Sequence, residues 1–257
     1  MMQSQTGSLL ANNKPYQGLG TQMPDNIDTR VSLALHPDNV MEIDGFDDET
    51  AAVLAPTMTA FSEAYQRIGA VWDGRAKAEK NPSWNQNQVI IETDQFAQKQ
   101  MAVIAKGFDA TRANLAKGIE HLERELTAPI TSKAAQSIAA EVRAYAKALP
   151  SAERMKFITD ALDNGDDLTA TAVLGAPNYL SGIDANMQAV FTRVYHERNA
   201  PAVAKRLKVM VAAKDMIEER AGIVFTDLEK AVGCPPHKAK RLREARTASE
   251  KAFVMAA

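Results

Sequence analysis

The chain has 257 residues, a formal net charge of −2 and a single cysteine. The near-neutral charge argues against general binding to nucleic acid or anionic membranes, and one cysteine excludes an intramolecular disulfide and a thiolate metal cluster. Alanine occupies 44 positions. Because alanine has the highest intrinsic helix propensity, the composition predicts an all-α protein.

Residues 1–48 are predicted to form an extended, irregular N-terminal arm. They are rich in Gln, Asn, Gly, Pro and Asp and show neither helical nor strand periodicity. Alone, such a segment buries too little apolar surface to offset its ordering entropy. It contains one short apolar run, and we expect Val31, Leu33 and Leu35 to make a contact there, by adding a strand or by packing into a neighbour's groove.

The first helix is expected to begin at the acidic residues 47–49, which suit the positive end of a helix. Pro56 lacks an N–H, so we predict an interruption there, followed by a longer helix over residues 57–80. Its apolar residues fall on one stripe, which includes Phe61. Residues 89–91 are apolar and are predicted to form a small strand or to cover the helices.

Residues 93–149 carry the clearest helical pattern and predict a long antiparallel helical hairpin that folds at Pro129. In its first arm, apolar residues recur in a near-heptad rhythm as far as Leu126. Gly107 and Gly118 interrupt this arm three helical turns apart, and so lie on nearly one face. We expect these two glycines to mark close packing of another helix.

Residues 150–257 are predicted to form a C-terminal helical bundle. Its expected helices cover residues 151–164, 167–174, 184–199, 201–232 and 237–254. A Gly/Pro turn, LGAPNYLSGI, is expected to fill the core with Tyr179, Leu180 and Ile183. Together with the long-helix hairpin region over residues 49–149, this makes a multi-helix bundle of about eight helices with essentially no sheet.

Charge is distributed unevenly along the chain. Residues 1–55 contain two basic and eight acidic groups, a net charge of −6, whereas residues 200–257 contain twelve basic and seven acidic groups, a net charge of +5. Opposite charge at the two ends suits head-to-tail contact between copies, or docking on a larger body. Two solvated surfaces without a partner are the alternative.

The last predicted helix begins with a basic run that could contact nucleic acid or a partner. Its cations are Lys238, Lys240, Arg241, Arg243 and Arg246. Each phosphate that such a group neutralises would add salt-sensitive affinity. However, Glu244 and Glu250 lie among the cations, and no aromatic residue is present for base stacking. A solvated or partner-facing helix is therefore favoured over a nucleic-acid interface.

No pattern of residues indicates catalysis. The sequence lacks a phosphate-binding GxxxxGK[ST] loop, an HExxH motif and a nucleophile elbow. His121 and Glu125 lie one helical turn apart, but two ligands alone make a poor metal site, and the acids of residues 163–167 lack the EF-hand spacing. We therefore predict that the protein is not an enzyme and has no catalytic, cofactor-binding or metal-binding residues.

The segment VLGAPNYLSGI, residues 173–183, and the Ala-rich helices around it resemble uncharacterised helical proteins encoded near virion genes in tailed bacteriophages. The resemblance implies a structural or virion-associated role. We therefore expect a non-enzymatic structural or assembly protein that forms homo-oligomers or docks on other structural proteins through its arm and helical surfaces. A nucleic-acid-binding or DNA-packaging or ejection factor that uses the basic helix is the alternative.

The sequence also predicts where the protein is made. No apolar run is long enough to span a bilayer, and the N-terminus lacks the basic start and apolar run of a secretory signal. We expect synthesis in the cytoplasm, and the resemblance to phage proteins adds the virion as a destination.

Overall fold

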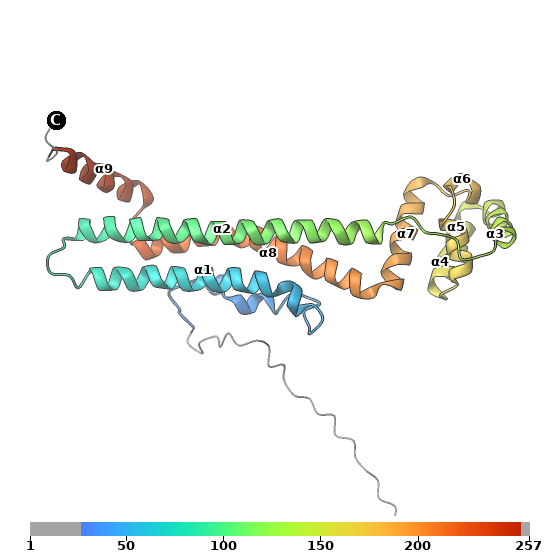
Figure 1. The fold of residues 1–257 in the computed structure, drawn as a ribbon, viewed down its shortest axis with the longest axis horizontal. Helices are drawn as coiled ribbons and strands as arrows, with labels where there is room; N and C mark the ends of the chain where they lie inside the picture. The colour runs from blue at the N-terminus through green and yellow to red at the C-terminus, as the bar shows by residue number, and fades with distance from the viewer. Residues whose placement is uncertain (1–26, 253–257) are drawn as a thin grey trace, which may run out of the picture.

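The computed structural model of the chain describes residues 27–252. Within that range there are nine α-helices, eight of them with at least seven residues, and no strand, so the predicted all-α multi-helix architecture is confirmed. The molecule is elongated, with a bundle of long helices at one end and a group of shorter helices at the other (Figure 1).

Three long helices, α1 (Ala51–Ala78), α2 (Gln86–Leu126) and α8 (Pro201–Val232), form the bundle. The 41 residues of α2 make it about 60 Å long at 1.5 Å per residue. Both α1 and α8 pack along α2 and run antiparallel to it (Figure 1). A long antiparallel helical hairpin is therefore present, and it consists of α1 and α2.

This hairpin is not the one predicted over residues 93–149. Asn85 caps α2 by accepting a hydrogen bond of 2.9 Å from the N–H of Gln88, so residues 89–91 are buried helical residues rather than a strand. The second predicted arm is the separate helix α3 (Gln136–Ala148), which packs against other short helices. The prediction was wrong because α1 and α8 already cover the apolar stripe of α2.

The predicted interruption at Pro56 is also absent, because α1 continues through this residue. Pro56 is exposed and lies in the second turn of the helix. Only one backbone hydrogen bond is lost there, and water can reach the carbonyl group that is left without a partner.

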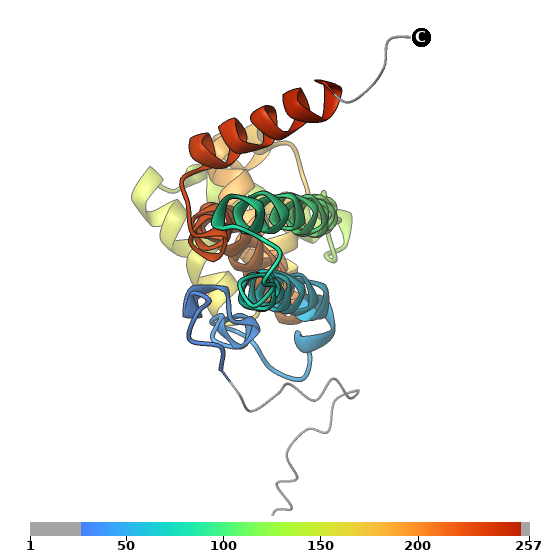
Figure 2. The same cartoon turned by 90° about the vertical axis from the view of Figure 1, so that its left-hand side faces the viewer.

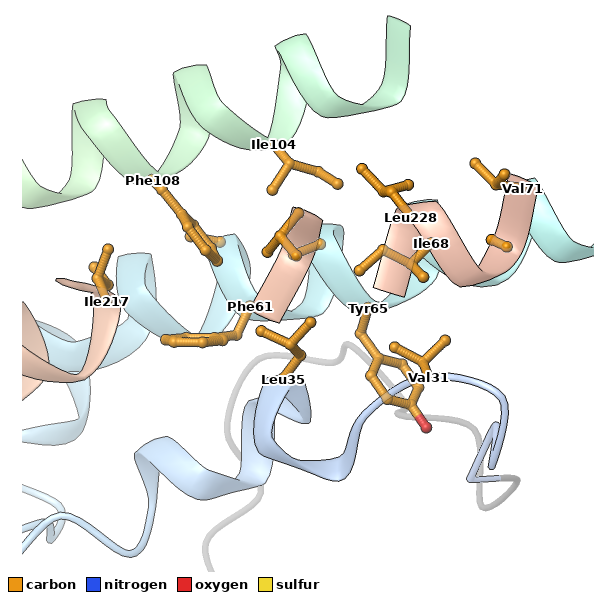
Figure 3. Close-up of a cluster of buried hydrophobic side chains, with 14 of the residues drawn as sticks. Val31, Leu35, Phe61, Tyr65, Ile68, Val71, Ile104, Phe108, Ile217 and Leu228 are labelled. Carbon is orange, nitrogen blue, oxygen red and sulfur yellow. The ribbon is translucent and has the colours of Figure 1, made fainter. Parts of the chain in front are cut away.

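Side chains from α1, α2 and α8 interlock in the centre of the bundle (Figure 3). The rings of Phe61 on α1 and Phe108 on α2 lie 5.2 Å apart between centroids. Ile104 and Ile217 are buried beside them. Each large side chain that is fully buried contributes about 1.5–3 kcal/mol. The packing of Ile217 on α8 with side chains of α1 and α2, which joins the last third of the chain to the first, therefore stabilises the bundle substantially.

Residues 27–50, called the strap below, lie across α1 and α8. The strap has no α-helix, but it contains two 3-10 turns, η1 (Leu33–Leu35) and η2 (Pro37–Val40). Val31 and Leu35 are buried in the core of their own chain, whereas Leu33 is 59% exposed. Val31 and Leu35 therefore do not add a strand or enter a neighbour's groove as expected, because the bundle of their own chain buries them.

Residues 127–200, called the head below, form a second hydrophobic cluster at the far end of α2. The helices of the head are α3, α4 (Ser151–Asp163), α5 (Asp167–Leu174), α6 (Asn178–Ser181) and α7 (Ala185–Asn199). The head is inserted between α2 and α8. The hydrophobic contacts consequently do not follow a division at residues 149 and 150, because α3 joins the head and α8 completes the bundle.

The guanidinium group of Arg154 connects three elements of the head. It donates hydrogen bonds to the carbonyl oxygens of Ala146 (2.8 Å), Lys147 (3.1 Å) and Leu149 (2.7 Å) at the end of α3. It also donates to the carbonyl of Gly182, which follows α6. The last carbonyls of a helix have no partner within the helix, so Arg154 satisfies them while it joins α4 to α3 and α6.

The last helix, α9 (Pro236–Ala252), follows a left-handed turn at Gly233, where φ is 76°. It leaves the direction of α8 and packs against the first turns of α2. The predicted basic helix is therefore present, and it lies at the end of the bundle opposite to the head (Figure 1).

The two glycines of α2 differ in their surroundings. A Cβ atom at Gly118 would lie 2.2 Å from Cε of Met210 on α8, so close helix packing is confirmed at this position. A Cβ atom at Gly107 would meet nothing within 4 Å, so the same prediction was wrong for Gly107.

These surroundings predict opposite outcomes for two alanine substitutions. Gly107→Ala should raise the free energy of unfolding by about 0.5–1 kcal/mol, since alanine is the better helix former. Gly118→Ala should give less stabilisation or a net loss, because Met210 must move. Chemical denaturation of both variants checks this, and an equal gain in the two would contradict close packing at Gly118.

Candidate functional site

Side chains of α8 hold the strap in place by hydrogen bonds to the backbone of the strap. Asp227 of α8 is only 1% exposed, and its carboxylate accepts a hydrogen bond of 2.7 Å from the N–H of Ser32. Arg220, also on α8, donates a hydrogen bond of 2.7 Å to the carbonyl oxygen of Ala34. A buried carboxylate is costly without a partner, so the strap and Asp227 depend on each other.

Ion pairs hold both ends of the strap. Lys205 and Lys208 of α8 pair with Asp47 and Asp44, respectively. Hydrogen bonds from these lysines hold the pKa values of both carboxyl groups below their ordinary value of 3.8. At the other end, Arg30 pairs with Asp73 of α1 at 2.8 Å, and its guanidinium also lowers the pKa of Asp28 within the strap.

The outer surface of the strap is acidic and partly apolar. Glu42 and Asp48 are exposed and form no ion pair within residues 27–252. Leu33 and Met41 are 59% and 43% exposed. The strap therefore presents free carboxylates and large apolar side chains on the side that faces away from the bundle.

Few apolar contacts hold α9 in place. Ala239 is its only buried residue among those described, and Leu242 is partly buried against the bundle core. Nε of Arg243 lies 3.0 Å from Oδ2 of Asp94, and Arg246 pairs with Glu92 at 2.5 Å. Ion pairs with α2 therefore orient this helix.

Burial makes the pair between Arg243 and Asp94 unusual for a surface helix. The Asp94 side chain is 13% exposed, and burial raises its pKa although the nearby Arg243 acts in the opposite direction. Nε of Arg243 is buried and makes no hydrogen bond within the described part of the chain, so the pair is a charge contact only.

The five predicted contact residues of α9 are thus divided between two roles. Arg243 and Arg246 are engaged with α2, and Lys240 lies 3.9 Å from Glu244 of its own helix. Lys238 and Arg241 are exposed and have no ion pair in the range that the structure describes. These two cations are the ones that remain for a partner.

A surface hollow of about 390 Å³ lies between the end of α1 and the start of α2. The lining residues are Gly74, Lys77, Ala78, Asn81, Trp84, Glu92, Thr93 and Phe96. The Thr93 hydroxyl is buried and has no hydrogen-bond partner among residues 27–252, and Glu92 is paired with Arg246. The hollow is mainly apolar and contains no pair of groups arranged as acid and base.

The head exposes many large hydrophobic side chains. They are Ile138, Tyr145, Met155, Leu168, Tyr179, Leu180 and Val190. These seven are nearly half of the fifteen such side chains exposed in residues 27–252, although the head has only about a third of those residues. Of the three residues expected to fill the core, Ile183 is buried but Tyr179 and Leu180 face solvent, because α6 is too short to bury both sides.

Two further findings concern metals and membranes. In residues 27–252, no three His, Cys, Asp or Glu side chains lie close enough together to hold a metal ion. Within the same range, no helix combines the length and apolar character required to cross a bilayer.

Cys234 is buried at the junction of α8 and α9, and burial raises the pKa of its thiol.

Comparison of the chain with protein-family models, curated proteins and solved structures finds no match in any of the three. The resemblance of residues 173–183 to phage proteins therefore stays a prediction.

Asp227 was not identified from the sequence, although a signal for it exists. It lies between Val224 and Ala231 on the buried stripe of α8, where an ionisable side chain requires a polar partner. That partner is the backbone N–H of Ser32, which lies 195 residues away in the sequence. No sequence pattern connects the two residues.

Asp227→Ala should destabilise the protein by about 1–3 kcal/mol, because the Ser32 N–H would be left buried without an acceptor. Lys230→Ala is the matched control, since Lys230 also pairs with Asp227 but is 61% exposed. Urea denaturation of both variants checks this. Equal, small losses would show that Asp227 does not hold the strap.

Acid should weaken the strap. The pKa values of Asp28, Asp44 and Asp47 are lowered in the folded chain, so their stabilising effect is complete above the ordinary value of 3.8 and is lost as the pH falls through the lowered values. The midpoint temperature of thermal unfolding should therefore decrease when the pH is lowered below about 4. The Asp44→Asn/Asp47→Asn variant should show a smaller fall, and an identical pH profile would contradict the role of these ion pairs.

Proposed function

We propose that this protein is a non-enzymatic structural or assembly component of a larger particle, which forms homo-oligomers or docks on other structural proteins. The observation that carries this proposal is the concentration of exposed large hydrophobic side chains in the head, seven of the fifteen in residues 27–252. Clusters of exposed large hydrophobic side chains in soluble proteins mark surfaces that bind other proteins.

The composition of the head surface favours a protein partner. Tyr145 is 57% exposed, and its ring packs edge-on against Phe157, 5.2 Å away between centroids. Ile138 lies two turns earlier on the same side of α3 and is 51% exposed. An exposed tyrosine whose ring is held by packing is typical of protein interfaces, because it provides a large contact area at a low entropic cost.

The connection between head and bundle holds this surface in a defined orientation. Arg193 of α7 pairs with Glu123 near the end of α2 at 3.0 Å. Nε2 of His196 lies 2.8 Å from the carbonyl oxygen of Ala128, directly after α2. These contacts suit a structural component, whose binding surfaces must keep a constant position relative to each other.

The resemblance of residues 173–183 to phage proteins supports a virion component, made in the cytoplasm and incorporated into the particle. The alternative, a nucleic-acid-binding or DNA-packaging factor, relies on α9. It is weakened because Arg243 and Arg246 would have to leave Asp94 and Glu92 before they could contact phosphates. A structural protein therefore stays the favoured function.

The native mass tests this proposal. Sedimentation velocity should show assemblies heavier than the 27.9 kDa chain, or complexes with a copurifying structural protein. Ile138→Ser/Tyr145→Ser should reduce the assembled fraction, whereas Phe225→Ser, on the equally exposed surface of α8, should not. A monomer at all concentrations, without a copurifying partner, would contradict the proposed function.

A further inference from the structure

The strap and α9 lie on opposite sides of the bundle and carry opposite charge (Figures 1 and 2). The strap contains seven acidic residues and one basic residue, a net charge of −6. In contrast, α9 contains six basic and two acidic residues, a net charge of +4. Because the bundle separates them, the two surfaces cannot meet within one molecule, but they can meet between two.

Each surface keeps charge after its internal ion pairs are formed. On the strap, Glu42 and Asp48 are exposed without an ion pair among the described residues. On α9, the same is true of Lys238 and Arg241. Free carboxylates thus face outward on one side of the molecule and free cations on the other.

We infer that the strap of one copy binds α9 of the next copy. This inference rests on the proposed function, since it adds to the head a second contact through which copies of the protein bind each other. The contact joins two different surfaces, so each copy still offers a free strap and a free α9 after it has bound one neighbour. Repetition of such a contact builds a ring or a filament.

The apolar side chains of both surfaces favour a second copy over nucleic acid. Leu33 and Met41 are exposed on the same strap as the free carboxylates. Ala245 and Ala248 are exposed on α9, and small residues let another chain approach the helix closely. Nucleic acid would bind the cations of α9 but would leave the apolar and acidic strap unused.

Two charge-reversal variants test the contact. Lys238→Glu/Arg241→Glu replaces two free cations of α9 with carboxylates, and Glu42→Lys/Asp48→Lys replaces the free carboxylates of the strap with ammonium groups; all four residues are exposed, so both variants should fold. Each variant alone should associate with itself roughly tenfold or more weakly than the unmodified chain, because like charges then face each other. An equimolar mixture should regain association, since the new carboxylates on α9 of one variant meet the new ammonium groups on the strap of the other.

Sedimentation velocity at low and high salt reads out the experiment, with circular dichroism to confirm folding. If the unmodified chain associates and neither variant changes this, the inference is wrong and the proposed function stands. If the unmodified chain neither associates nor binds a structural partner, both fall. A mixture that does not regain association overturns the inference. It is also overturned if Lys238→Glu/Arg241→Glu loses binding to a DNA duplex but keeps its self-association.

Discussion

The rest of the structure depends on the shared burial of three apolar stripes, one from each of α1, α2 and α8. A helix of 41 residues with two internal glycines gains little stability from helix propensity alone, and most helical stability in proteins comes from packing. Phe61, Phe108 and Ile217 supply that packing from three separate parts of the sequence. The bundle can therefore form only when the last third of the chain meets the first.

This requirement explains the positions of the other elements. The strap covers the side of α1 and α8 that α2 leaves open, and the buried carboxylate of Asp227 requires it there. The head forms the connection between the end of α2 and the start of the antiparallel α8, and so lies at the far end of the molecule. Since α9 begins where α8 ends, its cations lie at the opposite end. The bundle thus separates three surfaces with different chemistry.

Much of the secondary structure could be predicted from local signals. The helices predicted over residues 167–174 and 184–199 are present as α5 and α7, because the side chains of Asp166 and Asp184 accept hydrogen bonds from N–H groups in the first turn. An apolar stripe does not show which helix covers it, and on α3 the periodic residues Ile138 and Tyr145 are exposed. This ambiguity produced the wrong partner for α2 over residues 93–149.

The surfaces were harder to predict than the helices. The cations of α9 follow directly from the sequence, whereas the pairing of Arg246 with Glu92 joins residues 154 positions apart and follows from the fold alone. The strap has no periodicity, and its burial arises from tertiary contacts that no local pattern records. Val31 and Leu35 were therefore expected to bind a neighbour, and only Leu33 keeps a position from which it could.

Hydrogen exchange of the strap is the most direct test of this structure, because both the completed core and the acidic surface require the strap to be bound to α1 and α8. The amides of Ser32 and Leu35 should exchange as slowly as those in the centre of α1, with an opening free energy close to that of global unfolding. Exchange of these amides at the rate of an unstructured peptide, while α1, α2 and α8 stay protected, would contradict it.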